Sequence, residues 1–431
     1  MYSIASSKKM ERFRAEDGTY TTNTVKYSII LFYAIFLIIT SLYFNSIEEI
    51  IEGLIKINMA PSILVTDYIA VGNIGATLVN AGLLMVISLI VAKINNADMN
   101  GPIVAAVVTV GAFAFLGKNL YNIWAIFLGV YLYATIKKEK FSKFITVALF
   151  GTALGPMVSQ ITFGIELPLM YGIVLGNLFG IVAGFIMPSL ASHFSKFHHG
   201  FNLYNMGFTA GITGTLLMSL LRAYGKNHET VAILSEGNNL IFTIYFSIMF
   251  LSMIGIGYLL NNKSFSGYRI LMGRSGRAGT DFIALDGFGI SMVNMGLIGF
   301  LSMAYVLLVR GQLNGPNIGG VLTIVAFGAM GKHPKNIIPI FLGVFIASAT
   351  QIWNVNATGP MLAALFGTTL APIAGEYGWK VGIIAGFMHM IMVMNTGYLH
   401  GGMNLYNNGF AGGIVAAILV TFVNALKKEE I

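Results

Sequence analysis

The sequence predicts an all-α polytopic membrane protein with about 14 transmembrane helices, arranged as two inverted seven-helix repeats with short or broken helices near the centre. Three observations support this fold class. Hydrophobic residues make up 56% of the 431 residues and charged residues only 10%, whereas soluble domains carry roughly a quarter charged residues. Apolar runs of about 20 residues, the length of a membrane-spanning helix, recur from Tyr27 to Leu426. The third observation is an internal duplication.

The composition also excludes several classes of protein. The apolar runs lack the polar alternation of barrel strands, and helices satisfy their own backbone hydrogen bonds. The chain has no cysteine, so disulfides and thiolate metal or redox sites are excluded. Neither HExxH nor a Walker loop occurs, and we expect no enzyme activity, no metal site and no cofactor. The net charge of +8 is typical of loops that fix membrane orientation, and no nucleic-acid partner is expected.

The duplication is visible as polar and Gly/Pro matches in a nearly constant register, which shared apolar composition cannot produce. The matched pairs are TDYIAVGNIGATLVNAG (66–82) with TDFIALDGFGISMVNMG (280–296), NGP (100–102) with NGP (314–316), GK (117–118) with GK (331–332), LFGTALGP (149–156) with LFGTTLAP (365–372), and FNLYNMGFTAG (201–211) with MNLYNNGFAGG (403–413). The sequence therefore predicts two copies of one transmembrane unit.

Seven apolar segments are expected in each copy. Those of the first repeat, 26–222, are 26–45, 66–94, 101–118, 120–136, 142–160, 168–192 and 201–222. Those of the second repeat, 238–425, are 238–262, 281–309, 315–332, 336–351, 359–375, 379–397 and 403–425. A linker, 223–237, joins the repeats, and 1–25 and 426–431 form cytoplasmic tails. Segment 45–57, NSIEEIIEGLIKI, predicts an amphipathic surface helix that the second copy lacks. An odd number of spans per copy makes the copies face opposite ways.

Loop charge predicts the same orientation. The 137–143 connection, KKEKFSK, is basic, while the matching connection QIWNVNATG (351–359) carries no charge. The link 263–279 and both termini are also basic. Because basic loops face the cytoplasm, we expect both termini inside a bacterial inner (plasma) membrane. Five basic residues fall outside in this arrangement: Lys56, Lys118, Arg222, Lys226 and Arg310.

The two NGP motifs are candidate substrate-binding elements. Asn is a good helix N-cap and Pro suits the first turn, so Asn100-Gly101 and Asn314-Gly315 predict helix starts. The helices that follow are short for a full crossing, and short, Gly/Pro-interrupted segments at matching places indicate a transporter's binding site. Their N-terminal amides would face a polar or anionic substrate. Ordinary helix capping is the alternative, and these segments either span fully or re-enter.

The duplicated NLYN motif supplies further candidate substrate ligands. Asn side chains offer donors and acceptors that replace a solute's water shell, and neighbouring glycines allow close approach. Packing between helices is the alternative interpretation. Asn408 stands where the first copy has Met206, and this asymmetry favours the second copy as the substrate end. The candidate substrate-binding residues of this motif are Asn202, Tyr204, Asn205, Asn404, Tyr406, Asn407 and Asn408.

Carboxylates at membrane depth are costly and usually functional. Asp67 and Asp281 begin matched spans, and Asn80 and Asn294 lie further along them. These four residues are candidates for ion coupling, with helix capping as the alternative for the two carboxylates. Asp286 has no carboxylate counterpart in the first copy and lies about a turn and a half deeper than Asp281, which makes it the best single candidate for coupling.

The duplicated NLYN-GF and NGP blocks resemble an uncharacterised family of bacterial multi-pass membrane proteins described only as a tandem domain of unknown function. That resemblance would cover nearly all of the chain after residue 25 and implies no particular activity. In architecture alone, seven-plus-seven inverted spans with a short third span in each copy resemble the nucleobase and anion transporters. This second resemblance implies half-helices whose ends meet at the substrate, here the segments that the NGP motifs begin.

We therefore expect a secondary membrane transporter of a small polar or anionic solute. It would work by alternating access around a midplane site at the interface of the repeats. The alternatives are a passive channel or facilitator for a small polar solute and a membrane scaffold subunit. The expected partners are the solute or ion and the lipid bilayer, with a homodimer as the candidate assembly.

Overall fold

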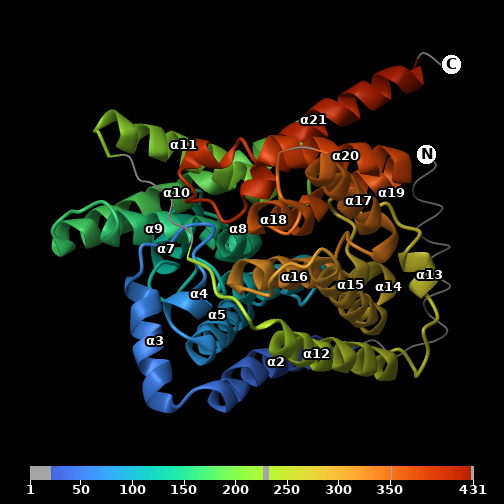
Figure 1. Ribbon diagram of the computed structural model, residues 1–431, viewed down its shortest axis with the longest axis horizontal. Coiled ribbons are helices and arrows are strands. Elements are labelled where there is room, and N and C mark those ends of the chain that lie inside the picture. The colour runs from blue at the N-terminus through green and yellow to red at the C-terminus, as the bar shows by residue number, and fades with distance from the viewer. Residues whose placement is uncertain (1–20, 227–232, 351, 429–431) are drawn as a thin grey trace.

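The computed structural model describes residues 21–226, 233–350 and 352–428, and within them the chain is helical apart from its connections and contains no strand (Figure 1). The helices of the first copy are α2 (Asn23–Phe44), α3 (Ile47–Met59), α4 (Tyr68–Val71), α5 (Ile74–Ile94), α6 (Gly101–Phe113), α7 (Trp124–Ile136), η1 (Phe141–Phe144), α8 (Ile145–Gly151), η2 (Thr152–Leu154), α9 (Gly155–Phe163), α10 (Leu169–Phe197) and α11 (Asn205–Ala223).

The second copy repeats the main helices in this order, but the four-residue α13 stands at the register of α3, and η1 and η4 have no counterparts among the residues that the structure describes. Its helices are α12 (Asn239–Leu260), α13 (Tyr268–Leu271), α14 (Phe282–Asp286), α15 (Phe288–Leu308), α16 (Gly315–Phe327), α17 (Pro334–Thr350), α18 (Thr358–Gly367), η3 (Thr368–Leu370), α19 (Ala371–Tyr377), α20 (Trp379–Val393), η4 (Gly397–His400) and α21 (Asn407–Lys428). The expected surface helix at 45–57 is α3, which begins with a capping box between Ser46 and Glu49.

Seven helices in the described part of the chain are long and apolar enough to cross a membrane. They are α2, α5, the continuous helix Phe141–Phe163, α10, α12, α15 and α21. The other seven expected spans contain shorter, broken or less apolar helices. Among these, α6 and α16 have 13 residues each, about 20 Å of helix, against a hydrocarbon core of about 30 Å. Length and composition make the chain a polytopic membrane protein, with short helices where the NGP motifs predict them.

Several expected spans are interrupted at equivalent places in both copies. A 3-10 turn just before Pro156 separates α8 from α9. An equivalent turn just before Pro372 separates α18 from α19. Proline lacks an N–H and cannot continue the preceding hydrogen bonds. The spans expected from residues 66 and 281 begin later than predicted, because Asn73 caps α5 and Gly287, with a φ of +97°, separates α14 from α15.

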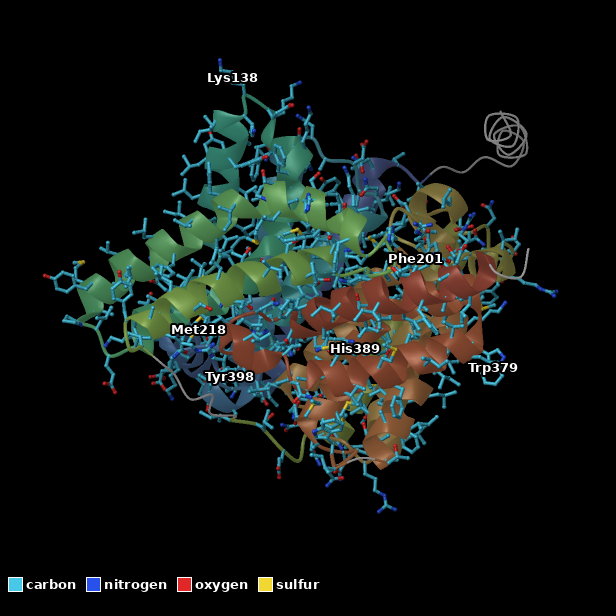
Figure 2. All side chains as sticks on the ribbon, turned by 90° about the horizontal axis from the view of Figure 1, so that it is seen from above. Lys138, Phe201, Met218, Trp379, His389 and Tyr398 are labelled. Carbon is cyan, nitrogen blue, oxygen red and sulfur yellow. The ribbon has the colours of Figure 1, made fainter. Side chains whose placement is uncertain are left out.

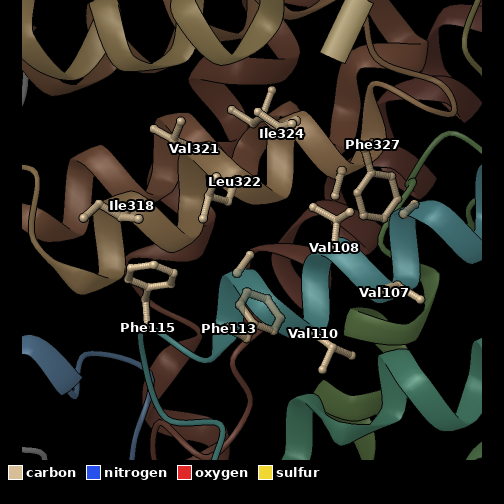
Figure 3. Packing of buried hydrophobic residues seen from close by; sticks show 14 of the residues in the cluster. Val107, Val108, Val110, Phe113, Phe115, Ile318, Val321, Leu322, Ile324 and Phe327 are labelled. Atoms are coloured by element: carbon tan, nitrogen blue, oxygen red, sulfur yellow. The ribbon is translucent and has the colours of Figure 1, made fainter. Parts of the chain in front are cut away.

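The two short helices lie in the middle of the molecule. In Figure 1, α2 and α12 run along one edge, α10, α11, α20 and α21 lie towards the opposite edge, and α16 lies between them. Helix α11 ends at one end of the molecule and α21 at the other. Helices α6 and α16 pack against each other, with Val108 and Leu322 between them (Figure 3).

Candidate functional site between the two copies

The NLYN motifs of the two copies meet at the starts of α11 and α21. The Nδ2 of Asn202 donates to the carbonyl of Gly409 at 2.9 Å, and the Nδ2 of Asn404 donates to the carbonyl of Gly207 at 3.1 Å. Each copy thus gives the other the same contact, which is the signature of a two-fold arrangement. The rings of Tyr204 and Tyr406 lie 4.8 Å apart between these contacts. The structure brings the predicted motifs together and gives the first asparagine of each a structural contact.

The last asparagine of each motif binds a histidine that sequence reasoning left aside. The Nε2 of His198 lies 2.9 Å from the Oδ1 of Asn205, and that of His400 lies 2.8 Å from the Oδ1 of Asn407. In the second copy, the Nε2 of His389 lies 2.9 Å from the Oδ1 of Asn408. An amide oxygen only accepts, so each histidine donates from this nitrogen. These pairs tie the start of each last helix to the segment before it.

A cavity of about 440 Å³ lies at this meeting point. Its rim includes Lys143, which belongs to the basic 137–143 connection, and its inner wall includes Tyr204, Asn205 and Tyr406. Phe150 and Phe327 form apolar walls, and His198 supplies a polar group. Of the predicted substrate ligands, the two tyrosines and Asn205 therefore line a space large enough for a small solute.

Two lysines at equivalent positions are buried, one of them against Tyr204, and sequence reasoning did not identify them as site residues. Lys118 is 1% exposed and Lys332 is fully buried. Lysine is almost never buried without a partner of opposite charge. Within the described residues, neither lysine forms an ion pair, since Lys143–Glu139 and Arg274–Asp286 are the ion pairs found there. A signal was present in the sequence, because the GK pair returns at the same register in both copies.

The lysine turns, residues 114–118 and 328–332, follow the short helices and are held by asparagines. The Nδ2 of Asn80 donates to the carbonyls of Ala114 and Lys118 at 2.9 Å each. The Nδ2 of Asn294 donates to the carbonyls of Gly328 and Lys332 at 2.8 and 2.7 Å. The structure thus places the two asparagines predicted for ion coupling under the lysine turns, where they hold the backbone.

A glycine and a second asparagine complete each lysine turn. Gly117 and Gly331 have φ angles of +72° and +84°, in the left-handed region that glycine adopts without strain. Their carbonyls accept hydrogen bonds from Asn122 and Asn336 at 2.9 and 2.8 Å. Two side-chain amides and one glycine therefore fix where each lysine leaves the backbone.

The two lysines have unequal surroundings. The Nζ of Lys332 donates to the hydroxyls of Tyr204 at 2.5 Å and Thr368 at 2.7 Å. It also lies 5.1 Å from the ring centre of Phe327, close enough for a cation–π contact. Lys118 lies 5.3 Å from the ring of Phe113, and its Nζ makes no hydrogen bond with any residue that the structure describes. Equivalent residues thus form two versions of one site, of which Lys332 has the more complete set of contacts.

The NGP motifs form the expected helix starts. The Oδ1 of Asn100 accepts from the amide of Ile103 at 3.0 Å, and that of Asn314 accepts from the amide of Asn317 at 3.1 Å. The amide of Gly101 donates to the Oδ1 of Asp281 at 3.0 Å. These amides are occupied by protein groups, and Pro102 is the residue of the two motifs that lines the cavity.

The predicted coupling carboxylates have protein partners as well. Asp67 accepts from the amide of Ile69 and from the amide and hydroxyl of Ser235. A Cβ on Gly315 would clash with the same carboxylate, so Asp67 lies at the start of α16 as Asp281 lies at the start of α6. Asp67 thus caps α4 and Asp281 caps α14. Each carboxylate also borders the start of the NGP helix of the other copy. Their role in ion coupling stays a prediction.

Asp286, the best single coupling candidate, forms an ion pair with the basic link. Its two carboxylate oxygens accept from the Nε and Nη2 of Arg274 at 2.7 and 2.8 Å. The side chain of Asp286 is 4% exposed and that of Arg274 is 23% exposed. This bidentate contact neutralises the carboxylate and holds the link against the start of the long helix α15.

These features define a polytopic helical membrane protein built from two copies of one unit around a shared centre. The chain belongs to the family described as "Protein of unknown function (DUF1576)", whose model matches residues 46–223 and 260–425. The two matches begin 214 residues apart and end 202 residues apart, which are also the separations of Lys118 from Lys332 and of Tyr204 from Tyr406. The duplication and the family resemblance are therefore confirmed. No curated protein and no solved structure matches the chain.

Proposed function

We propose that the protein is a secondary transporter of a small polar or anionic solute, working by alternating access around the meeting point of the two copies. The observation that carries this proposal is the cavity of about 440 Å³, which has the basic 137–143 connection at its rim and ends at Tyr204 and Tyr406. A scaffold subunit would need no such space beside Tyr204 and the buried Lys332 that it contacts.

An inverted layout of the copies is the first part of the proposal. It is supported by the opposite directions in which α11 and α21 leave the centre (Figure 1) and by the reciprocal contacts of Asn202 and Asn404. We take each copy to cross the bilayer seven times, with its main helices in the same order. Seven segments reverse the direction of the second copy, so equivalent surfaces face opposite sides of the bilayer. Fourteen crossings and cytoplasmic termini in an inner membrane complete this part.

The second part of the proposal is that access is open on one side only. Asn205 lines the cavity and is partly exposed, whereas the equivalent Asn407 is 5% exposed and accepts hydrogen bonds from Thr396 and His400. Pro188, Ala191 and Ser192 line the cavity, and larger residues stand at the equivalent positions 390, 393 and 394.

One-sided access favours a transporter over a passive channel. In a two-fold arrangement of inverted copies, the mirror conformation opens the second copy and closes the first. A solute at Tyr204 and Tyr406 would then face the opposite side without crossing a continuous pore. A passive channel remains the outcome to test, because it would expose both sides at once.

Single cysteines test the layout directly, since the natural chain has none. Lys140 and Asn356 are exposed residues at equivalent positions in matching connections. The first connection also contains Lys138, which Figure 2 shows at the edge of the molecule. We expect a membrane-impermeant maleimide to label Lys140→Cys from the cytoplasmic side and Asn356→Cys from the outside. Labelling of both from the same side would refute the inverted layout.

Reconstitution in liposomes tests transport itself. We expect uptake of solute against its concentration gradient when an ion gradient is imposed, and labelling of Ser192→Cys and Met394→Cys in mutually exclusive states. Downhill flux alone, with both cysteines labelled together, would indicate a channel. The absence of flux for every solute in a broad panel would leave the scaffold as the function.

A further inference from the structure

We propose that the solute is a small monovalent anion, which accepts a hydrogen bond from the Tyr204 hydroxyl with Lys332 behind it. This inference rests on the proposed transport function and identifies its substrate class. Tyr406 and Lys118 form the equivalent half-site that serves the opposite side of the membrane.

The first step is the missing counter-charge. A buried ammonium is costly unless an opposite charge lies near it. No described carboxylate forms an ion pair with either lysine, and Asp286 is already paired with Arg274. Two lysines at equivalent positions therefore lack a protein anion, and an anionic solute is the group that would neutralise them.

The second step is the direction of the hydrogen bonds. The Tyr204 hydroxyl accepts from the Nζ of Lys332 at 2.5 Å, so its own hydrogen remains available to donate. Tyr204 lines the cavity whereas Lys332 does not. In the proposed site, the Tyr204 hydroxyl donates to a solute in the cavity that this residue borders, and the neighbouring ammonium polarises the hydroxyl.

The third step is the character of the walls. Phe150, Phe327, Met206 and Met330 line the same cavity, and Phe327 covers the lysine on the side of the ring contact. Apolar walls cannot replace the water shell of a multiply charged ion. A monovalent, weakly hydrated anion loses less hydration free energy on entering the cavity, and so does a carboxylate with an apolar body. The walls therefore favour one negative charge over two.

The fourth step is the unequal state of the two half-sites. Lys118 donates to no described residue, and the hydroxyl of Tyr406 is buried without a hydrogen-bond partner among the described residues. The equivalent Tyr204 and Lys332 are hydrogen-bonded to each other. Both tyrosines line the cavity, but the pair of Tyr204 and Lys332 is assembled in this conformation and the pair of Tyr406 and Lys118 is not. Assembly of one pair at a time is what alternating access to a single anion requires.

Binding to the purified full-length protein tests the assignment. We expect sodium nitrate or sodium benzoate to raise the midpoint of thermal unfolding, because a ligand that binds the folded state stabilises it. Sodium sulfate at matched ionic strength and glycerol are expected to leave the midpoint unchanged. Stabilisation by nitrate alone identifies an inorganic anion as the substrate class, and stabilisation by benzoate alone identifies an organic carboxylate.

Two variants locate the site. Tyr204→Phe keeps the ring and removes the donor, and we expect the dissociation constant of the stabilising anion to rise about tenfold or more, as for a lost hydrogen bond to a charged group. Lys332→Met is expected to abolish stabilisation. Tyr245→Phe is the matched control, because this buried tyrosine bonds Thr40 at 2.6 Å and lies outside the cavity. Its dissociation constant is expected to stay within about twofold of the natural protein.

The outcomes separate this inference from the transport proposal. Accumulation of a neutral solute that is equal in the natural protein and Lys332→Met would overturn the anion assignment and leave transport intact. Anion binding that is unchanged in Tyr204→Phe would place the anion elsewhere. Lack of flux for neutral and anionic solutes alike would overturn the transport function itself. If Lys332→Met fails to fold, the Tyr204→Phe measurement and the anion panel on the natural protein still decide.

Discussion

Replacing Asn294 with alanine tests whether the lysine turns are held as the contacts indicate. The fully buried amide of Asn294 donates to the carbonyls of Gly328 and Lys332 at 2.8 and 2.7 Å. No other described group donates to either carbonyl. A buried acceptor left unpaired costs about 1–3 kcal/mol, so loss of both contacts is expected to lower the free energy of unfolding by about 2–5 kcal/mol.

Denaturant titration of the purified protein in mild detergent measures this change. Asn80→Ala removes the equivalent two contacts and is expected to cost a similar amount. Asn95→Ala is the control, because its amide bonds only the carbonyl of Val91 within its own helix, and we expect a change below about 0.5 kcal/mol. A loss of less than about 1 kcal/mol for Asn294→Ala, combined with an altered dependence of transport on the driving ion, would refute the structural role and favour the predicted ion-coupling role.

Three further predictions concern stability. Arg274→Ala leaves the buried Asp286 carboxylate unpaired, and because the arginine is 23% exposed we expect a loss of about 2–3 kcal/mol, at the low end for a buried pair; a double variant with Asp286→Ala should recover most of it in a double-mutant cycle. Gly331→Ala would strain a φ of +84° and clash with the carbonyl of Gly276, so its thermal midpoint should fall by several degrees, whereas Gly255→Ala, with open space around it, should leave the midpoint unchanged or higher. The pKa of Glu49 is lowered, first of all by the backbone N–H of residue 46. The stability that Glu49 gives to α3 is therefore present above the ordinary carboxyl pKa and is lost as pH falls through the lowered value. Protection of the α3 amides from hydrogen exchange should drop over that acidic range in the natural protein and not in Glu49→Gln.

Much of the framework was predictable from local rules. The NGP motifs predict helix starts because the Asn cap and the proline act within one turn, and α6 and α16 begin at Gly101 and Gly315. The duplication was predictable because sequence matches in a constant register can be recognised without knowing the fold that they encode. The starts of α5 and α15 were placed too early, because a glycine and an asparagine within an apolar run interrupt the helix without changing its hydropathy.

The contacts of the site were not predictable, because they join segments far apart in sequence. Lys332 contacts Tyr204, which is 128 residues away, and Thr368, which is 36 residues away. An asparagine has the same sequence signature whether it binds a solute or a carbonyl, so the sequence did not show that Asn80 and Asn294 hold the lysine turns. Asp286 looked like a free carboxylate because the charge of Arg274 was attributed to membrane orientation.

The differences between the copies carry as much mechanistic information as their likeness. If inverted copies were identical, the two conformations of the proposed transporter would have equal free energies, and neither side would be preferred at rest. Pro188, Ala191 and Ser192 line the cavity. The larger Met390, Val393 and Met394 stand at the equivalent positions of the second copy. Closing a surface with larger apolar side chains favours the closed state by the area they bury, and methionine, being flexible, can repack when that surface opens. On this reasoning, exchanging Met390 and Met394 for the proline and serine of the first copy should shift the resting population towards the opposite-facing state.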